Sequence, residues 1–95
     1  MESGNKDETP VKSYKKWQQI KMKDQIIASS MLRDRYIKFV FENNRKPNND
    51  EKKFITADVF TELGEKGIFI KDNEIIKYFK KKISDFDKSI EKLKG

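Results

Sequence analysis

The residues with the clearest chemical potential are lysines that recur along the C-terminal segment of the chain. On a helical wheel that starts at Ile76, four of them fall within an arc of about 60°, well away from the apolar side chains of the same segment. A row of ammonium groups on one helix face attracts phosphates without regard to base sequence. The alternative is a solvated face that keeps a lysine-rich helix soluble. The candidate phosphate contacts in this row are Lys77, Lys81, Lys88 and Lys92.

A second group of basic residues lies in the first half of the chain. Its lysines and Arg33 occupy the side of the wheel opposite Trp17 and Ile20. Arginines can add specificity, because a guanidinium binds a phosphate or a guanine edge bidentately whereas lysine acts as a point charge. Here too the alternative is an ordinary exposed face. The further candidate nucleic-acid contacts are Lys12, Lys15, Lys16, Lys23, Arg33, Arg35, Arg45 and Lys46.

The distribution of charge supports a basic, polarised surface. The formal net charge is +6, with 22 Lys and Arg against 16 Asp and Glu. Residues 11–46 carry ten basic and three acidic side chains, and residues 76–95 carry seven and three. The intervening residues 47–75 carry four basic and seven acidic side chains. Two basic blocks therefore flank an acidic one, an arrangement typical of a protein that binds polyanions on one side.

Catalysis is disfavoured by the residue types that the chain lacks. It contains no His and no Cys, which removes the commonest general base, the thiol nucleophile and the soft metal ligands. The closest carboxylate pairs, Asp85 with Asp87 and Asp50 with Glu51, are too close in sequence to face one another on a helix. No glycine-rich phosphate loop accompanies them. We therefore expect a binding protein that is not an enzyme and that needs neither a metal nor a cofactor.

Three aromatic residues invite two interpretations. Tyr14, Trp17 and Tyr36 could be platforms on which unpaired bases stack. Trp17, however, lies on the apolar stripe of its segment, which favours a place in the core for these rings. Asp24 falls in the middle of the same stripe. It is expected either to pair with a basic residue or to set the register of an oligomer.

The apolar periodicity predicts the elements that position these residues. Residues 1–10 lack periodicity and are expected to form a flexible tail. The pattern from Val11 to about Asn43 is helical and predicts two helical segments, or one helix that bends near Ser29 and Ser30, where the apolar stripe rotates. Its two stripes are Trp17, Ile20, Ile27, Ala28 and Met31, followed by Leu32, Tyr36, Phe39 and Val40.

The second half of the chain is predicted to contain two more helices. Residues 43–50 are expected to form a loop, and Thr56 to cap a short helix that ends near Gly64 and Gly67. The apolar stretch 67–71 suits a buried connector or a small strand. Asp72 or Asn73 is then expected to cap the last helix. Its apolar seam follows a heptad spacing through Ile76, Phe79, Ile83, Phe86, Ile90 and Leu93.

Together these patterns predict an all-α domain over residues 11–95, a small bundle of three to four helices with a long C-terminal heptad-patterned helix. The function expected is that of a small basic nucleic-acid-binding protein with a regulatory or accessory role, acting on DNA or RNA. The alternative is a helical protein-interaction module, an adaptor or inhibitor of a partner protein. The regular seam also allows a homodimer. The absence of Cys, of a signal peptide and of long apolar runs favours an intracellular setting (cytoplasm or nucleoid, or the nucleus in a eukaryote) without membrane association.

Overall fold

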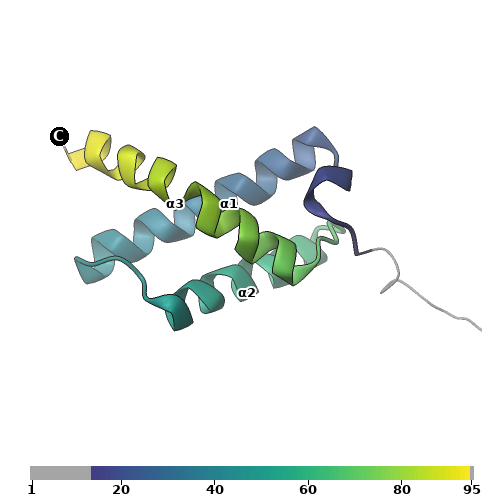
Figure 1. The fold of residues 1–95 in the computed structure, drawn as a ribbon, viewed down its shortest axis with the longest axis horizontal. Coiled ribbons are helices and arrows are strands. Elements are labelled where there is room, and N and C mark those ends of the chain that lie inside the picture. Colours follow the sequence, from purple (N-terminus) through teal and green to yellow (C-terminus); the bar gives the residue numbers. More distant parts are fainter. Residues whose placement is uncertain (1–13, 95) are drawn as a thin grey trace, which may run out of the picture.

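The computed structural model describes residues 14–94, which form three long helices and one short 3-10 turn. The turn is η3 (Trp17–Gln19), and the helices are α1 (Met22–Asn43), α2 (Asn49–Glu65) and α3 (Asp72–Lys94). Figure 1 shows α2 returning beside α1 and α3 crossing both, so that each helix packs against the other two. The described residues contain no β-strand. The prediction of an all-helical bundle is thus confirmed, with three helices in the part of the chain that the structure describes.

The first helix begins later than predicted. Within residues 14–21 the chain is not an α-helix, because its backbone pairs with the connector that precedes α3. The Lys15 N–H donates to the carbonyl of Phe69 at 3.0 Å, and the Lys71 N–H donates to the carbonyl of Lys15 at 3.0 Å. The Gln25 side-chain amide then donates to the carbonyls of Trp17 and Ile20, both at 3.0 Å. These hydrogen bonds satisfy backbone N–H and C=O groups that would bond to one another if the segment were part of the helix. The predicted start at Val11 and the predicted tail, residues 1–10, lie outside the described residues.

The helix is not broken near Ser29 and Ser30, because α1 continues through both residues to Asn43. Ser29 instead accepts a 2.9 Å hydrogen bond from the Tyr78 hydroxyl on α3. The helix buries a row of side chains four residues apart. Of the first predicted stripe, Ile20 and Ala28 are buried and Trp17 and Met31 pack against the core, but Ile27 is exposed. The helix ends at Asn44, whose left-handed backbone (φ 56°) lets its N–H reach the carbonyl of Val40. The buried row of α1 is Ala28, Leu32, Tyr36 and Val40.

The second helix begins at Asn49, well before the predicted cap at Thr56. Asn48 caps it, because its side-chain oxygen accepts from the Glu51 N–H at 2.9 Å while Glu51 accepts from the Asn48 N–H at 2.9 Å. Thr56 is buried in mid-helix, where its hydroxyl donates to the carbonyl of Lys53. The helix ends as expected at the glycines. Gly67 has a φ of 79°, which allows the following N–H of Ile68 to reach the carbonyl of Leu63.

The connector and α3 complete the core. Ile68 and Ile70 are buried, so the 67–71 stretch is a connector held by one isolated bridge. The predicted last helix is confirmed, but its buried face differs from the predicted seam, since Ile75 replaces Ile76 at one end and Leu93 is 61% exposed at the other. Figure 1 shows the last turns of α3 lying away from α2. The core residues of α3 are Ile75, Phe79, Phe86 and Ile90.

An aromatic cluster occupies the centre of the bundle. Tyr36 and Phe79 are fully buried, with ring centroids 5.9 Å apart, and Phe86 lies 5.9 Å from Tyr36 and 6.2 Å from Phe79. Burial of Tyr36 excludes it as a stacking platform for a base. Each of these rings removes a large apolar surface from water, which is the main stabilisation available to a domain of this size. None of the helices built by residues 14–94 combines the length and the hydrophobicity needed to cross a membrane.

Candidate nucleic-acid interface

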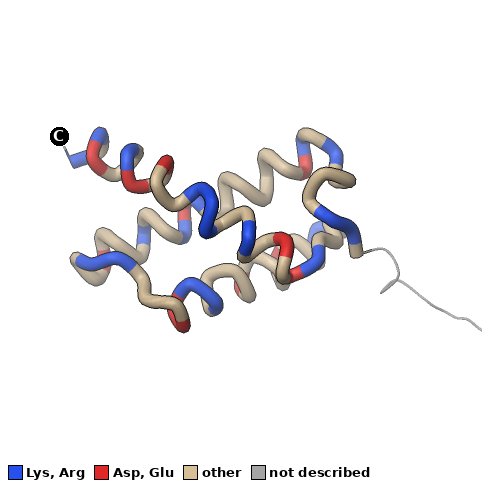
Figure 2. Tube along the Cα trace, in the orientation of Figure 1, with Lys and Arg blue, Asp and Glu red and all other residues tan. Residues whose placement is uncertain are grey.

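The lysines predicted from the helical wheel do share the outer face of α3. Lys77, Lys81, Lys88 and Lys92 are all exposed, whereas the core residues of the same helix point to the opposite side. We call these four residues the α3 lysine row. With a rise of 1.5 Å per residue, the row extends over about 22 Å of the helix. Figure 2 shows Lys and Arg recurring along α3, with Asp and Glu at its start and interspersed through its second half.

Most of the lysine row has no acidic partner in the described part of the chain. Lys77 pairs with Glu74 at 3.6 Å. Within residues 14–94, no carboxylate lies within ion-pairing distance of Lys81, Lys88 or Lys92. These three ammonium groups therefore interact mainly with solvent. They would lose few existing contacts on binding an anion.

The arginines are used differently, because each is paired with an acid of the same chain. Arg35 on α1 holds Glu62 and, at 3.7 Å, Asp58 on α2. Arg45 donates to both carboxylate oxygens of Glu51 at 2.7 Å. These pairs join neighbouring elements, so the guanidinium groups have structural roles. A role for these residues in reading a nucleic acid stays a prediction.

Among the remaining basic candidates of the first block, some form ion pairs with acidic side chains and one is simply exposed. Arg33 pairs with its neighbour Asp34 at 3.6 Å, and Lys46 reaches Asp87 on α3 at 3.1 Å. Lys23 is exposed near the start of α1. Lys12 lies outside the described residues. The structure therefore does not gather the whole predicted block into one surface.

One lysine of the first block, Lys16, is nevertheless brought close to the α3 lysine row. The backbone of Lys15 is bonded to the connector before α3, and the Trp17 N–H donates to the Glu74 carboxylate at 3.0 Å. This hydrogen bond is the main reason why the pKa of Glu74 is lowered, and nearby Lys77 and Lys16 lower it further. Lys16 and Lys77 thus lie on either side of one carboxylate. The N-terminal segment extends the basic surface beyond the first turn of α3.

An aromatic pair that the sequence did not predict lies beside the row. Trp17 stacks on Tyr78 of α3, with ring centroids 3.9 Å apart and an interplanar angle of 16°. Both rings are half-buried and border a hollow of about 290 Å³. Met22, Ile26 and Lys82 contribute to its walls. We call it the Trp17–Tyr78 hollow. No local pattern relates the two rings, because they are far apart in the sequence and only the tertiary fold stacks them.

Tyr14 and Asp24 lie elsewhere. The Tyr14 ring stacks on Phe60 of α2, with centroids 5.5 Å apart, and so packs onto the bundle. Asp24 is half-buried in the first turn of α1, beside a hollow of about 280 Å³ that Lys15 and Lys21 also line. It lies at the end of the bundle, not within the core row of α1. A polar position of this kind does not by itself specify an oligomer.

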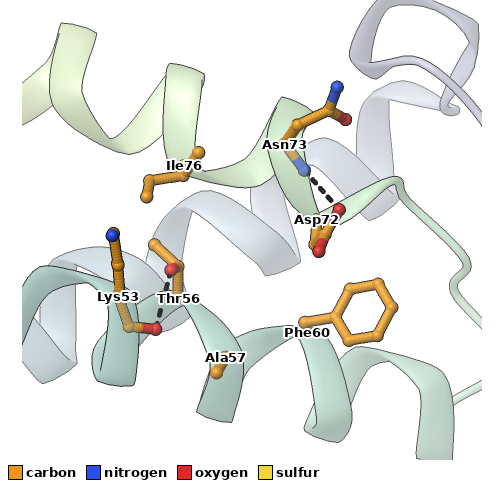
Figure 3. Close-up of a pocket in the computed structure, with 7 residues that line it drawn as sticks. All are labelled: Lys53, Thr56, Ala57, Phe60, Asp72, Asn73 and Ile76. Carbon is orange, nitrogen blue, oxygen red and sulfur yellow. Dashed lines mark hydrogen bonds between the residues drawn. The ribbon is translucent and has the colours of Figure 1, made fainter. Parts of the chain in front are cut away.

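A larger recess lies between α2 and the start of α3 (Figure 3). It measures about 400 Å³, and Ala57, Phe60 and Ile76 supply much of its apolar wall. Its polar groups bond locally, since Thr56 donates to the Lys53 carbonyl and the Asn73 N–H donates to Asp72. No cluster of three potential metal ligands occurs among the residues that the structure describes. The recess therefore has the character of an apolar contact surface.

The fold and the surface define a class: a three-helix domain with a lysine face on α3 and a stacked aromatic pair at its flank. Comparison with protein-family models, with curated proteins and with solved structures gives no match.

Proposed function

We propose that this protein binds nucleic acid as a small regulatory or accessory protein and holds the phosphate backbone on the α3 lysine row. The observation that supports the proposal is the exposure of Lys81, Lys88 and Lys92 on one helix face without an acidic partner among residues 14–94. Repeated cations on a straight element can neutralise successive phosphates. Lys16 would extend this surface at the N-terminal end of α3.

The contrast between lysines and arginines supports the same interface. The arginines and Lys46 stabilise the fold through ion pairs, whereas the lysine row makes few internal contacts. Binding through ammonium groups is expected to depend strongly on salt and weakly on base sequence, because counterion release supplies most of the free energy. Each phosphate contact adds about 0.9 to the slope of log affinity against log salt on duplex DNA, and about 0.7 on a single strand.

The test replaces the whole lysine row with glutamine, which removes four charges while preserving helix propensity. A labelled oligonucleotide is titrated at several salt concentrations and its anisotropy is measured. We expect the Lys77→Gln, Lys81→Gln, Lys88→Gln and Lys92→Gln variant to bind more weakly and with a flatter salt slope. The matched control changes four lysines elsewhere, which are Lys38, Lys52, Lys53 and Lys66.

The control separates a specific surface from the effect of net charge. Both variants carry the same net charge, so a nonspecific effect of charge would weaken both equally. An equal loss in the two variants, or an unchanged slope in the first, would contradict an interface on α3. Absence of binding by the parent at low salt would reject the function itself.

A second candidate function, protein binding, is favoured by the surface of α2. Phe54 is 72% exposed and borders a hollow of about 410 Å³ that shares Lys53 and Ala57 with the recess of Figure 3. An exposed ring next to an apolar recess is self-complementary, since in a two-fold contact each ring can enter the recess of the other copy. We therefore propose α2 as the surface of a homodimer, since the apolar face of α3 is used within the chain.

Sedimentation velocity tests this second candidate. The parent is expected to shift from monomer towards dimer at high micromolar concentration, and the Phe54→Lys variant to remain monomeric. Ile27→Lys, at an exposed apolar position of α1, is the control and should associate like the parent. If the parent stays monomeric, or if the two variants behave alike, the proposal of a homodimer through α2 is contradicted.

A further inference from the structure

We propose that the Trp17–Tyr78 hollow takes an unpaired base from a single strand whose phosphates lie on the α3 lysine row. This inference rests on the proposed function and names its substrate class, single-stranded nucleic acid. The hollow combines the three things that a base requires, which are an aromatic stack, apolar walls and adjacent positive charge.

The aromatic component is Trp17 together with Tyr78. The two rings lie nearly parallel, at 3.9 Å and 16°, so the pair is already fixed in the geometry of a stack. The Tyr78 hydroxyl is anchored by its bond to Ser29 on α1, and the backbone N–H of Trp17 donates to Glu74 on α3, which holds the segment that carries the indole. A base that joins this pair therefore meets a rigid platform, which lowers the entropic cost of binding. Both residues remain only half-buried and so keep part of their surface accessible.

The apolar walls have no other role within the described bundle. Met22 is 72% exposed and Ile26 is 58% exposed, on a face of α1 that the bundle leaves uncovered. They stand beside the aromatic pair at the hollow, which measures about 290 Å³. Large apolar side chains gathered around a recess mark a contact surface more often than a solvated one. A flat base can bury these side chains while its exocyclic groups remain near Ser29 and Ser30, which also line the hollow.

Positive charge lies at the edge of the hollow. The Lys82 ammonium is 5.8 Å from the centre of the Tyr78 ring and also 3.7 Å from Asp85. On the α3 wheel, Tyr78 lies only about 60° from Lys81. A backbone that follows the lysine row therefore passes next to the hollow and can direct one base into it. Charge complementarity thus favours a nucleic acid over an uncharged apolar partner.

The same geometry discriminates against a duplex. Bases in a duplex are stacked on one another, and one can enter a side pocket only after it is unpaired and turned out. The lysine row alone would accept either form, since it contacts phosphates only. Occupation of the hollow is therefore the feature that favours a single strand, DNA or RNA.

The experiment uses Trp17, which is the only tryptophan in the chain and thus a built-in reporter. Fluorescein-labelled oligo(dT) and oligo(U) of about 12 nucleotides, within the range of known single-strand sites, are compared with a duplex of the same length. Anisotropy reports binding, and the tryptophan emission of parallel samples with unlabelled strands reports stacking. We expect both single strands to bind and to quench Trp17 emission with the same midpoint, and the duplex to bind without comparable quenching.

The two readouts separate the two proposals. Single strands that raise the anisotropy but leave Trp17 emission unchanged would overturn the base site and leave the proposed function intact. Equal quenching by the duplex would also overturn it. No change in anisotropy with any probe would overturn both proposals. Quenching by oligo(dT) but not oligo(U), or the reverse, would retain the site and show which strand it prefers, and oligo(dU) would then separate the effect of the sugar from that of the thymine methyl group.

A pair of variants tests the hollow without disturbing the aromatic stack. Ile26→Glu places a carboxylate at the edge of the hollow, and we expect single strands to bind about tenfold more weakly, as lost stacking contacts usually produce. Phe41→Glu makes a similar change on the same helix, at a residue that is 45% exposed and does not line the hollow. Circular dichroism confirms that both variants fold. Equal affinities for the two variants would contradict the site.

Discussion

The hydroxyl of Tyr36 on α1 donates a 2.6 Å hydrogen bond to the carboxylate of Asp87 on α3. Tyr36 is fully buried at the centre of the aromatic cluster, and Lys46 from the α1–α2 loop pairs with the same carboxylate at 3.1 Å. Burial, followed by the hydrogen bond to Asp87, raises the pKa of Tyr36 above its usual value near 10. Three elements that are distant in sequence are therefore joined at one carboxylate.

Removing the hydroxyl of Tyr36 should destabilise the fold without creating a cavity in the core. Tyr36→Phe keeps the ring and loses the hydrogen bond to a charged acceptor, for which we expect a cost of about 1–2 kcal/mol in the free energy of unfolding. Urea denaturation at pH 7 measures the change. A stability equal to that of the parent would show that the bond contributes nothing net.

The same residue predicts a loss of stability in alkali. Because the pKa of Tyr36 is raised in the folded state, its contribution is fully present below pH 10 and is lost as the pH rises towards the folded-state value. Denaturation of the parent between pH 9 and 11 should therefore show a steeper decline than that of Tyr36→Phe. Parallel declines would contradict the raised pKa.

The lowered pKa of Glu51 predicts that the fold loses stability in acid. Its hydrogen bonds with Arg45, and next with the Asn48 N–H, lower its pKa from 4.5 to about 2. A depressed carboxylate stabilises the fold above pH 4.5 and loses that contribution as the pH falls to 2. Melting temperatures between pH 2 and 6 should depend less on pH in Glu51→Gln than in the parent. Glu65→Gln, at an exposed position at the end of α2, should behave like the parent.

The contribution of Asn48 as the N-cap of α2 can be tested separately from the charge of Glu51. Asn48→Ala removes the side chain that accepts from the Glu51 N–H, and loss of such a cap costs about 1 kcal/mol. Asn49→Ala, one residue later and inside the helix, should be nearly neutral because Asn49 is not the cap. Chemical denaturation of the two variants gives the comparison. A larger loss at Asn49 would place the start of the helix elsewhere.

The position of the α3 core face makes a sharper stability prediction. Phe79→Ala should cost about 3–5 kcal/mol, because the ring is fully buried in the aromatic cluster. Leu93→Ala should cost less than about 1 kcal/mol, because Leu93 is 61% exposed although it continues the heptad spacing. Thermal melts distinguish the two. Similar losses would indicate that the seam is buried along its whole length, as the sequence pattern alone suggested.

The features that could be predicted from the sequence are those that depend on neighbours within a helical turn. The period of its apolar residues established α3, and the same wheel placed Lys77, Lys81, Lys88 and Lys92 on the outer face. The cap of α2 is also encoded locally, since Asn48 and Glu51 have the spacing of a capping box, whereas Thr56, the predicted cap, lies within the helix. These features could be predicted because a helix places side chains by their local spacing.

Only the tertiary structure decided which distant groups meet. Residues before Met22 have a helical pattern, yet the bridge between Lys15 and Ile70 directs their backbone hydrogen bonds to another part of the chain. The stack of Trp17 on Tyr78 arises in the same way, because it requires the N-terminal segment to be folded back against α3. Periodicity specifies the face on which a side chain lies. It does not specify the partner of that face, which depends on how whole elements pack and on which backbone groups remain to be satisfied.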